Sequence, residues 1–97
     1  MRSLLQEQFE ARVRAAVQEC HSLGYHPTRF EQMLDQADAV SLAKRMVVSG
    51  ELQSGLKKLK EMNRIDLSVE SIMLEPQFCD LFTRQEIQAA DWRLKQL

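Results

Sequence analysis

The chain has 97 residues, a formal net charge of −1 and two cysteines, with 44% hydrophobic and 28% charged residues. This length suits one domain and excludes two independent cores, and the hydrophobic content excludes a disordered tail. The near-neutral charge argues against a dedicated nucleic-acid binder, because such proteins usually carry a basic excess that neutralises phosphates. Residues that lose little rotamer freedom in a helix dominate, so the composition predicts a single all-α domain over residues 1–97.

The first predicted helix covers residues 4–23. Ser3 can cap it, and Gln6, three residues further on, completes a capping box. Gly24 ends the helix with a left-handed residue, as in a Schellman motif. Apolar residues recur at spacings of three and four and form one stripe that we expect to be buried: Leu5, Phe9, Val13, Ala16, Cys20 and Leu23.

Two shorter helices are predicted over residues 28–36 and 39–48. Thr28 with Glu31 forms a second capping box at the start of the former. Asp38 is expected to cap the latter. Their buried faces are expected to contain Phe30, Met33, Leu34, Ala37, Val40, Ala43, Met46 and Val47.

Residues 52–62 are predicted as a fourth helix, which Asn63 closes in the left-handed conformation. Gly55 weakens its beginning, so the sequence also allows a start at Ser54. The following run, residues 65–70, contains β-formers but is too short and isolated to build a sheet. The inward residues of the fourth helix are expected to be Leu52, Leu56, Leu59 and Met62.

The last two helices are predicted over residues 69–74 and 84–95. Ser68 caps the first, and Thr83 with Glu86 forms the capping box that opens the second. Connections of two to four residues force neighbouring helices to pack side by side. We therefore expect a compact orthogonal array of five to seven helices with a long N-terminal helix. The inward residues of the final helix are expected to be Ile87, Ala90 and Leu94.

The sequence contains no pattern typical of catalysis. No serine lies in a Gly-x-Ser-x-Gly elbow, and no glycine-rich loop follows a strand to cradle a phosphate. Asp35 and Asp38 are close in sequence, but each is explained by a helix end. We therefore expect no enzymatic activity, no catalytic residues, no cofactor and no small-molecule substrate.

Four residues, Cys20, His21, His26 and Cys79, match the ligand count of a structural zinc site but not its spacing. Adjacent helical residues point about 100° apart, so Cys20 and His21 can hardly face one ion. We expect two reduced, buried thiols and no metal. The N-terminus turns polar too early for a secretory signal and no apolar run approaches a membrane span, which predicts a soluble cytoplasmic protein with no membrane partner.

Charge is unevenly distributed in the second half of the chain. Residues 51–64 carry four basic and two acidic residues, whereas residues 65–82 carry four acidic residues and no basic one. The basic segment can be drawn as the second helix of a helix-turn-helix. A solvated surface is the favoured explanation of this pattern, because the positive charge lies towards the C-terminal end of the helix, where it complements the helix dipole. The functional alternative is a DNA- or RNA-binding regulator that uses Lys57, Lys58, Lys60 and Arg64.

Trp92 is the best pointer to a binding partner. At 100° per residue it lies opposite the inward stripe of its helix, near Gln88 and Lys95. Tryptophan is enriched at the centres of protein interfaces and is costly to leave in water. The structural alternative is that Trp92 covers an edge of the core, and the functional hypothesis is a partner-binding face formed by Trp92, Gln88 and Lys95.

Three segments carry a family resemblance: residues 25–30 (Tyr-His-Pro-Thr-Arg-Phe), 64–70 (Arg-Ile-Asp-Leu-Ser-Val-Glu) and 81–86 (Leu-Phe-Thr-Arg-Gln-Glu). Over about residues 24–95, the chain resembles a small bacterial and phage family of uncharacterised all-helical proteins. Family members usually have Gly where this chain has Asn63. The resemblance implies a compact helical domain from a bacterium or its phage, and it implies no activity.

The sequence therefore predicts a non-catalytic protein-interaction domain. By analogy with other small helical domains, it would act as an adaptor, antitoxin or inhibitor. Its helical face would dock onto another protein or onto a second copy of the chain. Nucleic-acid binding through the basic helix is the alternative.

Overall fold

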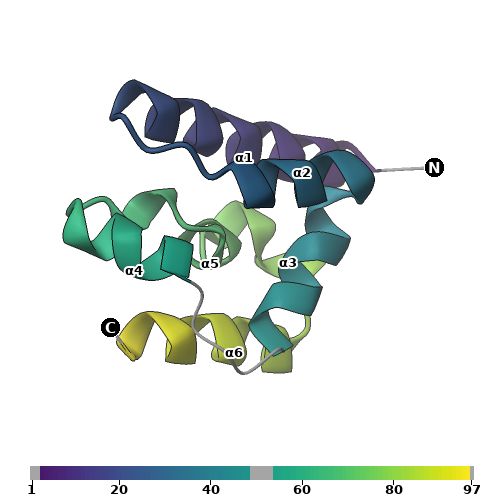
Figure 1. The fold of residues 1–97 in the computed structure, drawn as a ribbon. Coiled ribbons are helices and arrows are strands. Elements are labelled where there is room, and N and C mark those ends of the chain that lie inside the picture. Colours follow the sequence, from purple (N-terminus) through teal and green to yellow (C-terminus); the bar gives the residue numbers. More distant parts are fainter. Residues whose placement is uncertain (1–2, 49–53, 97) are drawn as a thin grey trace.

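The computed structural model describes residues 3–48 and 54–96, which fold into helices joined by short turns (Figure 1). The predicted all-α array with a long first helix is confirmed. Within the described residues there are six α-helices, two 3-10 helices and no strand. They are α1 (Leu4–Ser22), α2 (Thr28–Gln36), α3 (Ala39–Val48), α4 (Ser54–Glu61), η1 (Ile65–Leu67), α5 (Val69–Met73), η2 (Pro76–Leu81) and α6 (Arg84–Lys95).

Capping boxes begin the first and the last helix, as predicted. At α1, the Ser3 hydroxyl accepts a hydrogen bond from the Gln6 amide at 3.2 Å, and the Gln6 side chain accepts from the Ser3 amide at 2.8 Å. At α6, Thr83 and Glu86 make the same reciprocal pair at 3.2 and 2.8 Å. Each box satisfies two backbone donors that have no partner inside the helix.

Left-handed residues end α1 and α4. Gly24 has φ 87° and Asn63 has φ 59°, as the sequence predicts. The residue after each one folds back by a Schellman hydrogen bond, from the Tyr25 amide to the Cys20 carbonyl at 2.9 Å and from the Arg64 amide to the Leu59 carbonyl at 2.8 Å. The ends of α1 and α4 can therefore be recognised in the sequence from a residue that tolerates the left-handed conformation.

The start of α2 differs from the prediction. Thr28 is the first helical residue, its N-cap is Pro27, and no side chain caps the end, so the predicted Thr28–Glu31 capping box is wrong. Glu31 instead binds the His21 ring on α1, which diverts its carboxylate from the helix end. The predicted start of the fourth helix at residue 52 lies outside the described residues.

The helices form three levels in Figure 1. The first two, α1 and α2, form the upper level, α4 and α5 lie in the middle, and α6 runs along the bottom. The third helix, α3, crosses steeply from the upper level to α6. None of the described helices combines the length and apolar character that a bilayer crossing requires.

The core is built around Phe9, which is fully buried on α1. Its ring makes edge contacts with Phe78 and Phe82, with centroids 5.3 Å apart in both pairs. Such aromatic pairs add to the free energy gained from burying the rings. One predicted core residue is misplaced, because Leu23 caps the end of α1 and is 44% exposed. The other fully buried apolar residues are Leu42, Ala43, Ile72, Met73 and Ala90.

Candidate protein-docking surface

The last helix, α6, is held against the molecule on one side only. It packs on α5 and α3 and carries two buried residues, Ala90 and Arg93. Two predicted inward residues, Ile87 and Leu94, are half-buried at the edges of this inner side. The remaining side of α6 faces outward.

The outer face of α6, as we define it, comprises Gln85, Gln88, Asp91, Trp92 and Lys95. These residues recur at helical spacings of three and four, so the helix aligns them on one side. Trp92 is 51% exposed, and Gln88 and Lys95 are exposed beside it. The Lys95 ammonium pairs with the Asp91 carboxylate at 2.8 Å. The structure therefore brings the three residues of the predicted partner-binding set together on one exposed face.

Trp92 differs from the other exposed apolar side chains. Among the described residues, the exposed large hydrophobics are Leu4, Leu23, Val48 and Trp92. The first three lie at the first residue, the cap or the last residue of a helix, where incomplete burial is ordinary. Trp92 lies inside α6, three residues before the last helical residue, and the start of this helix is fixed by the Thr83–Glu86 capping box. Its exposure is therefore a feature of how α6 is oriented.

A buried ion pair fixes that orientation from the inner side. The Arg93 guanidinium donates from Nε to the Glu70 carboxylate at 2.8 Å, and both side chains are at most 3% exposed. The pair joins α6 to α5. The sequence does not predict this pair, because Glu70 lies in the acidic segment 65–82, whose favoured interpretation is a solvated surface. Helical spacing could have shown that Arg93 is buried, because it lies three residues after Ala90, on the inner side of α6.

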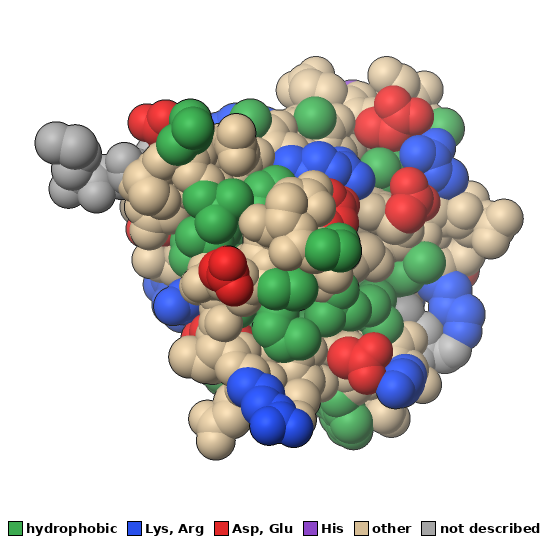
Figure 2. Space-filling view, turned by 180° about the vertical axis from the view of Figure 1, so that it is seen from behind, with side chains coloured by type: hydrophobic (Ala, Val, Ile, Leu, Met, Phe, Trp, Pro, Cys, Tyr) green, Lys and Arg blue, Asp and Glu red, His purple; other side chains and the backbone are tan. Residues whose placement is uncertain are grey.

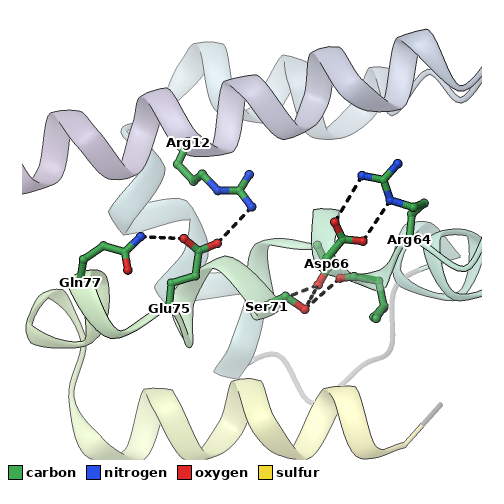
Figure 3. Close-up of polar contacts among 8 residues, drawn as sticks. Arg12, Arg64, Asp66, Ser71, Glu75 and Gln77 are labelled. Atoms are coloured by element: carbon green, nitrogen blue, oxygen red, sulfur yellow. Dashed lines mark hydrogen bonds and ion pairs between the residues drawn. The ribbon is translucent and has the colours of Figure 1, made fainter.

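Two other acidic residues of that segment, Asp66 and Glu75, are also paired (Figure 3). Arg64 bonds to Asp66 at 3.2 Å and reaches Glu19 on α1 at 3.3 Å. Glu75 pairs with Arg12 on α1 at 3.1 Å. The hydrogen bond from Arg64 lowers the pKa of Asp66, and the same bond raises the pKa of Arg64. The charge imbalance seen along the sequence is therefore largely neutralised in space.

The basic set of the alternative function is divided by these contacts. Arg64 is engaged by two carboxylates, whereas Lys57, Lys58 and Lys60 are exposed on α4. On the face seen in Figure 2, Lys and Arg side chains are interspersed with Asp and Glu and form no broad positive surface. The sequence-predicted cluster is thus reduced to three lysines on one short helix.

The four candidate metal ligands do not converge. Cys20 is buried in the core, and burial raises the pKa of its thiol. Cys79, predicted to be buried, is half-buried on η2. His21 binds Glu31, and the rings of His21 and His26 lie 4.8 Å apart. Across the described part of the chain, no three His, Cys, Asp or Glu side chains are grouped to hold a metal ion.

No family model matches the chain, and no similar protein was found among curated proteins or solved structures. The resemblance over about residues 24–95 therefore stays a prediction.

Proposed function

We propose that this chain is a non-catalytic interaction domain that docks onto another protein through the outer face of α6, with Trp92 as the anchor. The observation that carries the proposal is the 51% exposure of Trp92 on the outer face of a helix whose inner side is held by the buried Glu70–Arg93 pair. Burying a tryptophan against a partner removes a large apolar area from water, and such residues dominate interface energetics.

The neighbours of Trp92 suit the rim of an interface. Gln85 and Gln88 offer neutral donors and acceptors, and the Asp91–Lys95 pair contributes no net charge. A small apolar centre with a polar surround is the usual composition of a docking site. A second copy of the chain is the simplest partner, and an adaptor, antitoxin or inhibitor would use the same face on a different protein.

The test compares the wild-type chain with Trp92→Ala. Each is immobilised and exposed to extract from the native host, and captured proteins and nucleic acid are quantified, while sedimentation velocity measures self-association. We expect Trp92→Ala to weaken association by about 2 kcal/mol or more, as interface tryptophans often do. Its free energy of unfolding should stay within about 0.5 kcal/mol of wild type, because surface substitutions change stability little.

The matched control replaces Lys57, Lys58 and Lys60 by Gln. It removes the exposed charge of α4 and leaves the outer face of α6 intact. Protein capture that survives the lysine variant and is lost with Trp92→Ala supports docking through α6. Capture that Trp92→Ala leaves unchanged, or capture of nucleic acid that the lysine variant abolishes, contradicts the proposal.

A further inference from the structure

A cavity of about 80 Å³ lies between the upper level of the fold and the middle level. Its walls come from α1, the turn before α2, α3, α4 and the segment around α5. The lining is mainly apolar and includes Val17, Phe30, Leu56 and Leu59. The cavity is open on one side, and it is larger than the single-water voids that protein interiors normally contain.

The placement of α4 accounts for the cavity. Among the described elements, α4 packs chiefly on η1. Leu56 and Leu59 point inward and are buried, yet they line the cavity on the side of α1 and α2. A molecule seated there would touch α1, the turn before α2 and α4 together. It would supply the contacts that these elements do not make directly.

Four polar groups at the wall define what the cavity can accept. The Ser68 hydroxyl is already engaged, because it donates to the Ser71 hydroxyl at 3.0 Å. The Cys20 thiol is neutral, because burial raises its pKa. The Tyr25 hydroxyl is likewise held protonated by burial, and within the described residues it has no hydrogen-bond partner. Glu70 also lines the cavity, but its carboxylate is bound by Arg93 at 2.8 Å. The wall is therefore apolar with one uncommitted hydroxyl donor.

Gly55 leaves room for that hydroxyl. A Cβ atom at Gly55 would lie 3.0 Å from the Tyr25 oxygen, closer than ordinary van der Waals contact. The absence of a side chain at Gly55 thus lets Tyr25 reach over the start of α4 at the cavity wall. Tyr25 can offer its hydroxyl to a molecule inside.

We propose that this cavity binds a small, neutral, mainly apolar molecule no larger than one aromatic ring, whose single polar group meets the Tyr25 hydroxyl. An enclosed apolar cavity of about 150 Å³ admits benzene or xenon. This cavity is smaller, at about 80 Å³, so a ring would enter it in part and project through its open side. A charged ligand would lose its hydration without an uncommitted opposite charge among the described lining residues. The site is separate from the outer face of α6.

The probe is benzyl alcohol, which has one ring, one hydroxyl and no charge. Titration followed by amide chemical shifts should move resonances of lining residues such as Val17 and Leu59 and saturate at millimolar concentration. Protonated benzylamine has a similar shape with a positive charge, and it should bind at least tenfold more weakly. Shifts that do not saturate, or that map elsewhere on the molecule, overturn the proposal.

Variants distinguish the cavity from the rest of the surface. Val17→Phe fills the cavity and should weaken benzyl alcohol binding at least tenfold. Tyr25→Phe should weaken it about threefold and leave toluene binding unchanged, because toluene offers no hydroxyl. Trp92→Ala is the control and should bind benzyl alcohol as wild type does, so the cavity and the docking surface succeed or fail separately. Equal binding by Val17→Phe and wild type would refute the site.

A measurement on the wild-type chain covers the case in which Val17→Phe does not fold. Iodoacetamide modifies Cys20, in the cavity, and Cys79, on η2, and mass spectrometry of the peptides gives both rates. Saturating benzyl alcohol should slow modification of Cys20 at least threefold and leave Cys79 unchanged. Equal rates at Cys20 with and without benzyl alcohol contradict the proposal.

Discussion

The two sides of α6 reverse the ordinary distribution of side chains. Arg93, a charged residue, is completely buried on the inner side, whereas the adjacent Trp92 is 51% exposed on the outer side. Buried arginine is rare unless it is paired, and Arg93 is paired with Glu70 at 2.8 Å. The inner side is therefore explained by contacts within the chain, but nothing within the described chain requires a tryptophan on the outer side.

Arg93 and Trp92 therefore have different roles, because Arg93 positions α6 and Trp92 is exposed by that position. A buried ion pair contributes little net stability, because the loss of hydration offsets the attraction between the charges. What the Glu70–Arg93 pair does supply is a defined position of α6 against α5, since a shift by one residue would separate the charges. That fixed position directs Trp92 outward.

We expect the largest change in the free energy of unfolding from breaking the buried Glu70–Arg93 ion pair. Arg93→Met leaves the Glu70 carboxylate buried without its 2.8 Å donor, which should lower the free energy of unfolding by about 3–5 kcal/mol. Urea denaturation followed by circular dichroism measures the change.

The double variant Glu70→Leu with Arg93→Met is the matched control. It removes both charges, so its unfolding free energy should return to within about 1 kcal/mol of wild type or exceed it. If the double variant is as unstable as Arg93→Met alone, the pair is not the reason for the loss.

We expect a smaller loss of stability when the capping box that starts α6 is removed. Thr83→Ala removes the side-chain acceptor for the Glu86 amide, which should cost about 1 kcal/mol of stability. Thr83→Ser retains the hydroxyl and should cost much less. Denaturation curves that coincide for the two variants would show that the cap does not anchor the helix.

Most local features of the fold followed from the sequence, except the capping box predicted at Thr28 and Glu31. Ser3 with Gln6, Thr83 with Glu86, Gly24 and Asn63 all mark helix ends, because a cap acts within a few residues of itself. The outward position of Trp92 also followed, since helical periodicity needs only neighbouring residues.

Features that depend on distant segments did not follow. The pairing of Arg64 with Glu19 joins residues 45 positions apart, and Arg93 with Glu70 joins residues 23 apart. Counting charges along the chain therefore gave an acidic and a basic segment, whereas the fold pairs Asp66, Glu70 and Glu75 with arginines and leaves three lysines of α4 exposed. The cavity was also unforeseen, because its walls come from several helices whose packing no single segment specifies.

We expect the ion pair of Arg64 and Asp66 to make a weak, pH-dependent contribution to the free energy of unfolding. It is an exposed counterpart of the buried Glu70–Arg93 pair. Arg64 lowers the pKa of Asp66, so this contact stabilises the fold fully above the unfolded value of about 4 and less as the pH falls below it. Asp66→Asn should lose only a few tenths of a kcal/mol at pH 7, because the Asp66 side chain is 60% exposed.

Unfolding curves at pH 7 and pH 3 measure this difference. The gap between wild type and Asp66→Asn should narrow at the lower pH. A gap that widens on acidification would contradict the assigned direction.

The smallest effect on stability is expected from the exposed lysines of α4. Replacing Lys57, Lys58 and Lys60 by Gln should change the unfolding free energy by less than about 0.5 kcal/mol. Gel-shift assays with DNA and RNA at physiological salt should show no binding tighter than micromolar for the wild-type chain. Submicromolar binding that falls steeply with added salt would favour nucleic acid over a protein partner.

The central claim, that α6 presents Trp92 for docking, is tested most directly by acrylamide quenching of tryptophan fluorescence. Trp92 is the only tryptophan in the chain, so the signal reports one side chain. In dilute protein the account predicts red-shifted emission that acrylamide quenches readily, and blue-shifted, protected emission at concentrations where the chain associates. Blue-shifted emission that resists acrylamide in the monomer would place Trp92 in the core and contradict the account.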